Sequence, residues 1–129
     1  MRTLLPPGWP RPKGYSNGIE AQGRTVFVAG QIGWNEQGQL QTSSLAGQFR
    51  QVLSNTLAVL KEASAGPEHI VRMTWFITSR DEYMSSQAEL GAAWRELMGR
   101  NYPAMSVIIV SGLVEPEAKV EIETTAVLP

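Results

Sequence analysis

The chain of 129 residues contains no cysteine and a single histidine, His69. Without cysteine it can form no disulfide, no thiolate metal site and no cysteine nucleophile. One imidazole is too few for a site built from several histidines, so we expect no metal site. Aromatic residues make up 8% of the chain and do not alternate with basic residues, which argues against a base-stacking surface for nucleic acid.

Excess charge of either sign is also lacking. Lysine and arginine number 11, against 12 aspartates and glutamates, and the net charge is −1. Nucleic-acid binding needs clustered basic residues, so we expect no nucleic-acid partner. No apolar run approaches the length of a membrane span, and the N-terminus lacks the long apolar core of a signal peptide. We therefore expect a cytoplasmic protein with no membrane partner.

The length and composition predict a single domain over residues 1–129. Its first 14 residues are rich in proline, which removes backbone donors, so we expect residues 1–14 to form an irregular arm. Trp9 is expected to dock this arm onto the body. Because a chain of this size buries a modest fraction of its surface, a subunit interface would add apolar burial.

Hydrophobic periodicity and turn residues predict the element order β-β-α-β-α-β-β, an α+β fold with two helices on one face of the sheet. Ser43 or Ser44 can cap the first helix. Ser79 and Glu82 have the spacing of a capping box for the second helix. The expected strands cover residues 15–21, 25–29, 70–78, 105–110 and 119–127, and the expected helices end near Gly66 and Gly99.

The last strand alternates between apolar and acidic residues. Val120 and Ile122 point to one face, and Glu121 and Glu123 point to the other. The second face of the sheet is therefore polar without being fully charged, which suits an interface between subunits.

Five segments, in this order along the chain, resemble motifs of the RidA family, also known as the YjgF or endoribonuclease L-PSP family. Each motif is short, but the match extends over nearly the whole chain. The segments are Gly-Tyr-Ser-Asn-Gly (14–18), Val-Ala-Gly-Gln-Ile (28–32), the first helix (48–60), Tyr-Pro-Ala-Met-Ser (102–106) and Val-Glu-Ile-Glu (120–123).

The resemblance implies a chorismate-mutase-like fold of the bacillus type, assembled as a homotrimer with clefts between subunits. It also implies a hydrolase, an enamine/imine deaminase that converts reactive enamines and imines to a carbonyl product and ammonia. Members of the family that deaminate use no metal and no organic cofactor, so the expected partner is a small-molecule enamine or imine.

The motif matches assign candidate site residues. Glu121 matches the glutamate that the family uses near the catalytic water, where a carboxyl group can exchange protons or orient water; the alternative is a structural carboxylate. Tyr15 matches the cleft tyrosine, whose phenol can donate to a substrate. Gly30 and Gln31 stand where backbone amides can approach a ligand. Gln87 occupies the polar position of the second helix.

Met105 is the main departure from the family, whose best-known members carry an arginine there. An arginine binds a carboxylate with a planar fork of donors, whereas methionine offers only a soft apolar surface. We predict that Met105 contacts the substrate. Together with a nearby tryptophan, it is expected to favour a larger or less charged ligand. The candidate tryptophans are Trp34, Trp75 and Trp94, and the candidate replacement cations are Arg72, Arg100 and Lys13.

Three hypotheses follow. The first is a divergent deaminase that uses Glu121 and acts on 2-iminobutanoate and 2-iminopropanoate or on larger aminomuconate-type substrates. The second is a non-catalytic trimer of the same fold that binds small molecules or proteins. The third, a ribonuclease, is the weakest because the charge is balanced and His69 has no basic neighbour with which to form a nuclease pair.

Overall fold

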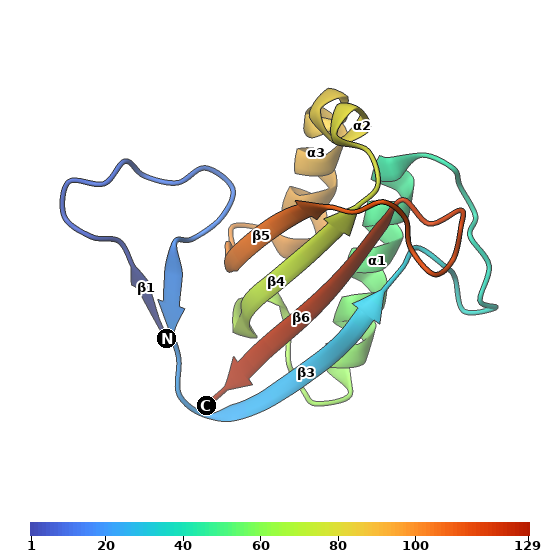
Figure 1. The fold of residues 1–129 in the computed structure, drawn as a ribbon. Coiled ribbons are helices and arrows are strands. Elements are labelled where there is room, and N and C mark those ends of the chain that lie inside the picture. Colours follow the sequence, from blue (N-terminus) through green and yellow to red (C-terminus); the bar gives the residue numbers. More distant parts are fainter.

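The computed structural model describes all residues, 1–129, and shows a mixed sheet that carries its helices on one face (Figure 1). The strand order is β3 (Arg24–Gln31), β6 (Val120–Leu128), β4 (Ile70–Ile77) and β5 (Ala104–Ile109). Strand β6 is antiparallel to both of its neighbours, and β4 and β5 are parallel. This is the predicted α+β fold, and each of these strands lies close to its expected range.

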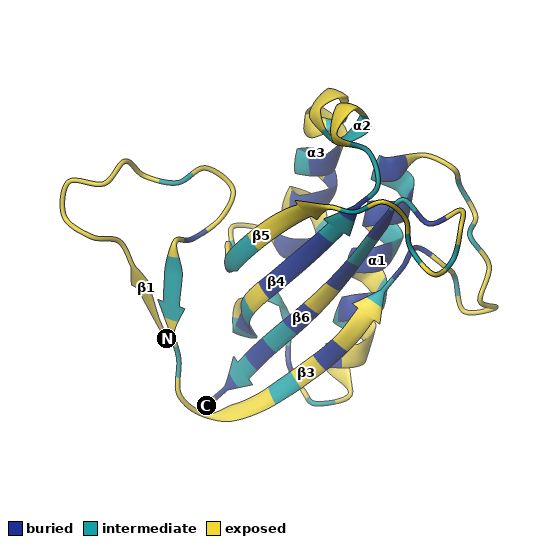
Figure 2. Cartoon of the chain, in the orientation of Figure 1, coloured by how far each residue is buried: buried dark blue, intermediate teal, exposed yellow.

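The core lies between the sheet and the helices. Strand β6 alternates as predicted, because Val120 and Ile122 are fully buried whereas Glu121 and Glu123 stay accessible on the opposite face. Figure 2 shows the same alternation along β6 and the mostly exposed β3 beside it. The open face of the sheet therefore remains uncovered within one chain.

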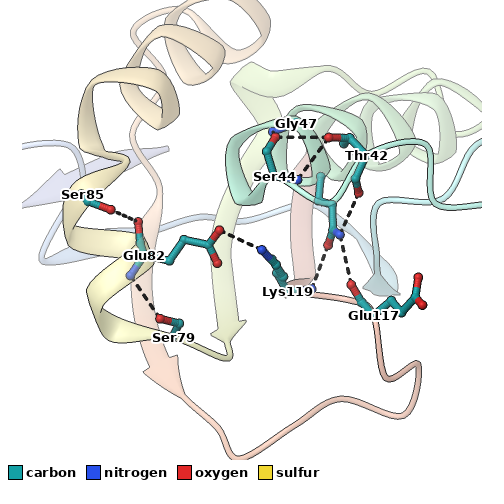
Figure 3. Close-up of polar contacts among 9 residues, drawn as sticks. Thr42, Ser44, Gly47, Ser79, Glu82, Ser85, Glu117 and Lys119 are labelled. Carbon is teal, nitrogen blue, oxygen red and sulfur yellow. Dashed lines mark hydrogen bonds and ion pairs between the residues drawn. The ribbon is translucent and has the colours of Figure 1, made fainter.

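Helix α1 (Leu45–Lys61) packs a continuous apolar stripe against the sheet. Ser44, one of the two expected caps, accepts a hydrogen bond of 3.0 Å from the backbone N–H of Gly47 (Figure 3). A 3-10 turn, η1 (Pro67–His69), then leads into β4. No helix of the protein is both long and apolar enough to cross a membrane.

The expected second helix is divided in two, α2 (Arg80–Ser85) and α3 (Gln87–Met98), with a break at Ser86. The capping prediction is half right. The Ser79 hydroxyl accepts from the Glu82 N–H at 3.1 Å, but the Glu82 carboxylate does not reach back; it pairs with Lys119 Nζ at 2.9 Å (Figure 3). The ion pair ties α2 to the segment just before β6.

The N-terminal arm differs from the prediction. Residues 2–4, expected to be irregular, form strand β1 (Arg2–Leu4), which pairs with β2 (Gly18–Glu20) in a separate two-stranded sheet. Strands β1 and β2 stand apart from the main sheet (Figure 1), and the loop between them meets it at Ser16, which forms a parallel bridge to Ala104 of β5. Trp9 does not dock onto the body of its own chain, because 58% of it is exposed.

Buried Gln48 of α1 fixes the approach to β6. Its Nε2 donates to the carbonyls of Thr42 and Glu117, at 3.0 and 3.1 Å, and its Oε1 accepts from the N–H of Lys119 at 2.8 Å. Gln48 is only 1% exposed, so all three hydrogen bonds are made by a buried residue. Gln48 thereby fixes the backbone at Lys119, directly before β6 and two residues before Glu121.

Candidate functional site

A cleft of about 540 Å³ lies at the β5 edge of the sheet, between β5, helices α2 and α3, and the end of the N-terminal arm. Its volume is within the range of small-molecule sites, roughly 300–1,000 Å³. Its lining is mainly apolar and contains no acidic residue. The lining residues are Lys13, Gly14, Tyr15, Trp75, Tyr83, Gln87, Leu90, Gly91, Trp94, Arg95, Tyr102, Met105 and Val107.

Stacked aromatic rings form one wall of the cleft. The ring centroids of Trp75 and Trp94 are 6.1 Å apart, and those of Trp94 and Tyr102 are 6.2 Å apart with planes within 10° of parallel. Tyr83 meets Trp75 edge to face at 6.4 Å. Such geometries are favourable for aromatic pairs and hold the rings rigid. Two of the three candidate tryptophans thus line the cleft, but Trp34 does not.

Tyr15 reaches the cleft because the next residue is anchored to the start of β5. The Ser16 N–H donates to the Pro103 carbonyl at 3.0 Å, and the Ser16 hydroxyl donates to the Tyr102 carbonyl. Ser16 is 7% exposed, whereas Tyr15 is 42% exposed and free to meet a ligand. Tyr15 therefore lines the cleft at the β5 edge, with its side chain accessible.

Gln87, at the first turn of α3, also lines the cleft as predicted. Its Nε2 donates to the Tyr83 carbonyl at 2.8 Å, which satisfies the end of α2 across the break at Ser86. The side-chain carbonyl oxygen of Gln87 makes no hydrogen bond within the chain, so it is available to a donor on a ligand.

Met105 faces the same cleft and packs, half-buried, against the core. Of the expected replacement cations, Lys13 lines the cleft, while Arg72 and Arg100 do not. A second cation, Arg95, lines it and was missed by the sequence analysis.

A sequence signal for Arg95 exists. Gln87, Gly91 and Arg95 recur every four residues, which places them on one side of α3, and all three line the cleft.

Glu121 lies elsewhere, on the open face of the sheet and beside Gly30 of β3. A Cβ atom added to Gly30 would come within 2.5 Å of Glu121 Oε2 and 2.9 Å of its Cδ. The absence of a side chain at Gly30 therefore makes room for the Glu121 carboxylate. This carboxylate is half-buried and forms no ion pair or hydrogen bond within the chain.

Gln31 follows Gly30 at the end of β3, where the pairing with β6 is irregular between Val28 and Gln31. Its Nε2 donates to the Ala29 carbonyl at 3.1 Å, so the side chain folds back on its own strand. The structure thus brings Gly30, Gln31 and Glu121 together, but the side-chain amide of Gln31 already donates a hydrogen bond to its own strand.

The predicted site residues form two separate groups in one chain. Glu121 pairs with Phe76 across β6 and β4, whereas the adjacent, core-facing Ile122 pairs with Trp75. Met105 is in register with the buried Met73, on the side of the helices. The Glu121 group and the cleft group therefore lie on opposite faces of the sheet, and β5 and β3 form its opposite edges.

Comparison with known proteins agrees with the fold. Residues 10–128 match the family model described as "Endoribonuclease L-PSP". A RutC family protein from Synechocystis is 35% identical, covering 100% of this chain and 98% of that protein. The crystal structure of YyfB from Yersinia pestis, a Rid-family protein of unknown function, superimposes with a TM-score of 0.85 at 33% identity, covering 98% of each chain. A protein from Dermatophagoides farinae named 2-iminobutanoate/2-iminopropanoate deaminase is 28% identical over 98% of this chain and 96% of its own.

Proposed function

This chain belongs to the RidA family, and from that membership and the layout of its two residue groups we propose that it is an enamine/imine deaminase. The observation that carries the proposal is the unpaired Glu121 carboxylate, for which Gly30 leaves room. The relative from Dermatophagoides farinae, named as a 2-iminobutanoate/2-iminopropanoate deaminase, supports the same reaction class.

The reaction consumes one water and needs no redox partner. An enamine first takes a proton on carbon and loses one from nitrogen, which gives the imine. Water then adds across the C=N bond, so that its oxygen bonds to carbon and one of its protons passes to nitrogen. The second proton of the water passes from oxygen to nitrogen as the C–N bond breaks, which releases ammonia and leaves the carbonyl. Glu121 is suited to these proton movements, because a carboxyl group positioned next to the reacting atoms can deliver or accept a proton and orient the water.

We propose further that the complete site forms between subunits of a homotrimer. One chain presents Glu121 on its open sheet face and the cleft at its β5 edge, so a contact that places one group against the other must join two chains. Such a head-to-tail contact can close into a ring, and three subunits then hold three equivalent sites. The open face suits burial against a second copy, since Phe27 is 78% exposed and Ile108 is 43% exposed.

A non-catalytic binding module of the same fold is the second candidate, and Met105 favours it. With methionine in place of the arginine of the best-known members, position 105 lacks the donor fork that holds a small 2-imino acid in those members. The ribonuclease reading has less support. The Nδ1 atom of His69 accepts a bond of 3.0 Å from the Gly66 N–H, which assigns this histidine a local structural role outside the cleft.

The test is ammonia release from a panel of enzymatically generated small 2-imino acids and larger, aminomuconate-type enamines. Wild type is compared with Glu121→Gln, and Glu123→Gln serves as the matched control because Glu123 lies on the same strand and face. Release above the uncatalysed rate that falls by about 100-fold or more in Glu121→Gln, and not in Glu123→Gln, would support the deaminase. No release from any member of the panel would support the binding module instead.

A further inference from the structure

The cleft carries uncompensated positive charge. Lys13 and Arg95 line it together, no aspartate or glutamate does, and neither cation takes part in any of the ion pairs of the protein. An arginine without a carboxylate partner, on the rim of a concave and largely apolar site, is a ready anchor for an anionic ligand group.

The guanidinium of Arg95 lies beside Gly91, one turn earlier on α3. Its Nη1 would be 3.3 Å from a Cβ atom at Gly91, so the side chain folds back over the bare backbone of α3 at that position. Gly91 itself lines the cleft. Arg95 is exposed, so its guanidinium lies at the open rim of the cleft, where a ligand can reach it.

The aromatic wall sets the chemistry of the rest of the ligand. Trp75, Trp94 and Tyr102 form a rigid stack with Met105 beside it. Trp75 and Trp94 are buried in this stack, so the surface that it offers to a ligand is mainly that of Tyr102, which is 36% exposed. A methyl or ethyl side chain would cover little of this surface, whereas a planar ring can stack on it and contact the methionine sulfur.

We propose that Arg95, and not residue 105, binds the substrate carboxylate, and that the substrate is a 2-imino acid with an aromatic side chain or its enamine. The role of this ligand as a substrate rests on the deaminase proposed above. The reaction is Ar–CH₂–C(=NH)–COO⁻ plus water to Ar–CH₂–C(=O)–COO⁻ plus ammonia, in which the carboxylate stays bound and the ring stays stacked.

Binding is measured separately from turnover, by calorimetric titration of the protein with phenylpyruvate, the stable product of the phenyl substrate. The comparison ligands are pyruvate, which lacks the ring, and methyl phenylpyruvate, which lacks the charge. Arg95→Gln is compared with Arg100→Gln, a nearby arginine that does not line the cleft. Phenylpyruvate should bind wild type about tenfold or more tightly than either comparison ligand, and Arg95→Gln should lose about tenfold while Arg100→Gln stays within about twofold.

Equal affinity of wild type and Arg95→Gln for phenylpyruvate would overturn the assignment of Arg95. Affinity for pyruvate equal to that for phenylpyruvate, or no binding of phenylpyruvate to wild type, would overturn the aromatic ligand class.

Ammonia release is then measured with the imine of phenylalanine, generated by an amino-acid oxidase. This assay distinguishes failure of the Arg95 assignment from failure of the proposed deaminase function. Release that depends on Glu121 but not on Arg95 refutes the inference and leaves the deaminase intact. Arg95-dependent binding without any release refutes the deaminase and supports an aromatic carboxylate as the ligand of a binding module.

Discussion

Gly30→Ala tests how closely Glu121 must be placed. The new Cβ would come within 2.5 Å of Glu121 Oε2, 2.9 Å of Cδ and 3.0 Å of Cγ. All three atoms belong to a flexible, half-buried side chain, so the carboxylate can swing away and the backbone need not move. Gly30 is not among the glycines with positive φ, so alanine fits its backbone conformation.

The two consequences of this substitution differ in size. Because the clash is relieved by a side-chain movement, the free energy of unfolding should change by less than about 1 kcal/mol, helped by the smaller backbone entropy of alanine. Displacement of a catalytic group by about 1 Å can reduce a rate by about 100-fold, so we expect kcat for ammonia release to fall by roughly 10- to 100-fold.

The assay combines the rate of ammonia release with urea unfolding of the same preparations. Gly112→Ala is the control, because a Cβ atom there meets nothing within 4 Å and φ is not positive. If Gly30→Ala released ammonia at the wild-type rate, the position of the Glu121 carboxylate would not depend on the absence of a side chain at residue 30. A large loss of stability would also contradict it.

Three further predictions address the supports of the site. Gln48→Ala leaves two carbonyls and the Lys119 N–H without their buried partner, so urea unfolding should show a loss of about 3 kcal/mol; an unchanged midpoint would contradict the role of Gln48. Ser16→Ala removes the hydroxyl tether of the Tyr15 segment and should raise KM a few-fold at a stability cost of about 1 kcal/mol, which steady-state kinetics and unfolding together would reveal. Phe27→Glu alters an exposed side chain of the open face, so the chain should stay folded but elute as a monomer in size-exclusion chromatography; an unaltered oligomer would exclude this part of the face from the interface.

Much of the fold was predictable because its signals are local. The alternation of Val120 to Glu123 assigned both faces of β6, and Ser44 and Ser79 cap the helices as expected. The failures arose where a contact distant in sequence decides the outcome. Strand β1 (Arg2–Leu4) exists only through its pairing with β2, and Glu82 pairs with Lys119, 37 positions away, which no helix-capping pattern could indicate.

The sequence indicated candidate residues for the site, but it did not indicate how they are arranged in space. Tyr15, Gln87 and Met105 line one cleft, but no local pattern indicated that this cleft lies on the face of the sheet opposite to that of Glu121. Arg95 lies on the cleft side of α3, four residues after Gly91, but a four-residue spacing occurs on every helix face and does not by itself distinguish a binding residue.

The most direct test of the shared site is a mixture of two defective subunits. Glu121→Gln retains an intact cleft, and Tyr15→Ala retains an intact Glu121 group, so each variant expressed alone should release ammonia slowly. If each site joins the cleft of one subunit to Glu121 of the next, random mixed trimers from coexpression should recover about one quarter of the wild-type sites. Activity in the mixture no higher than in either variant alone would contradict a site shared between subunits.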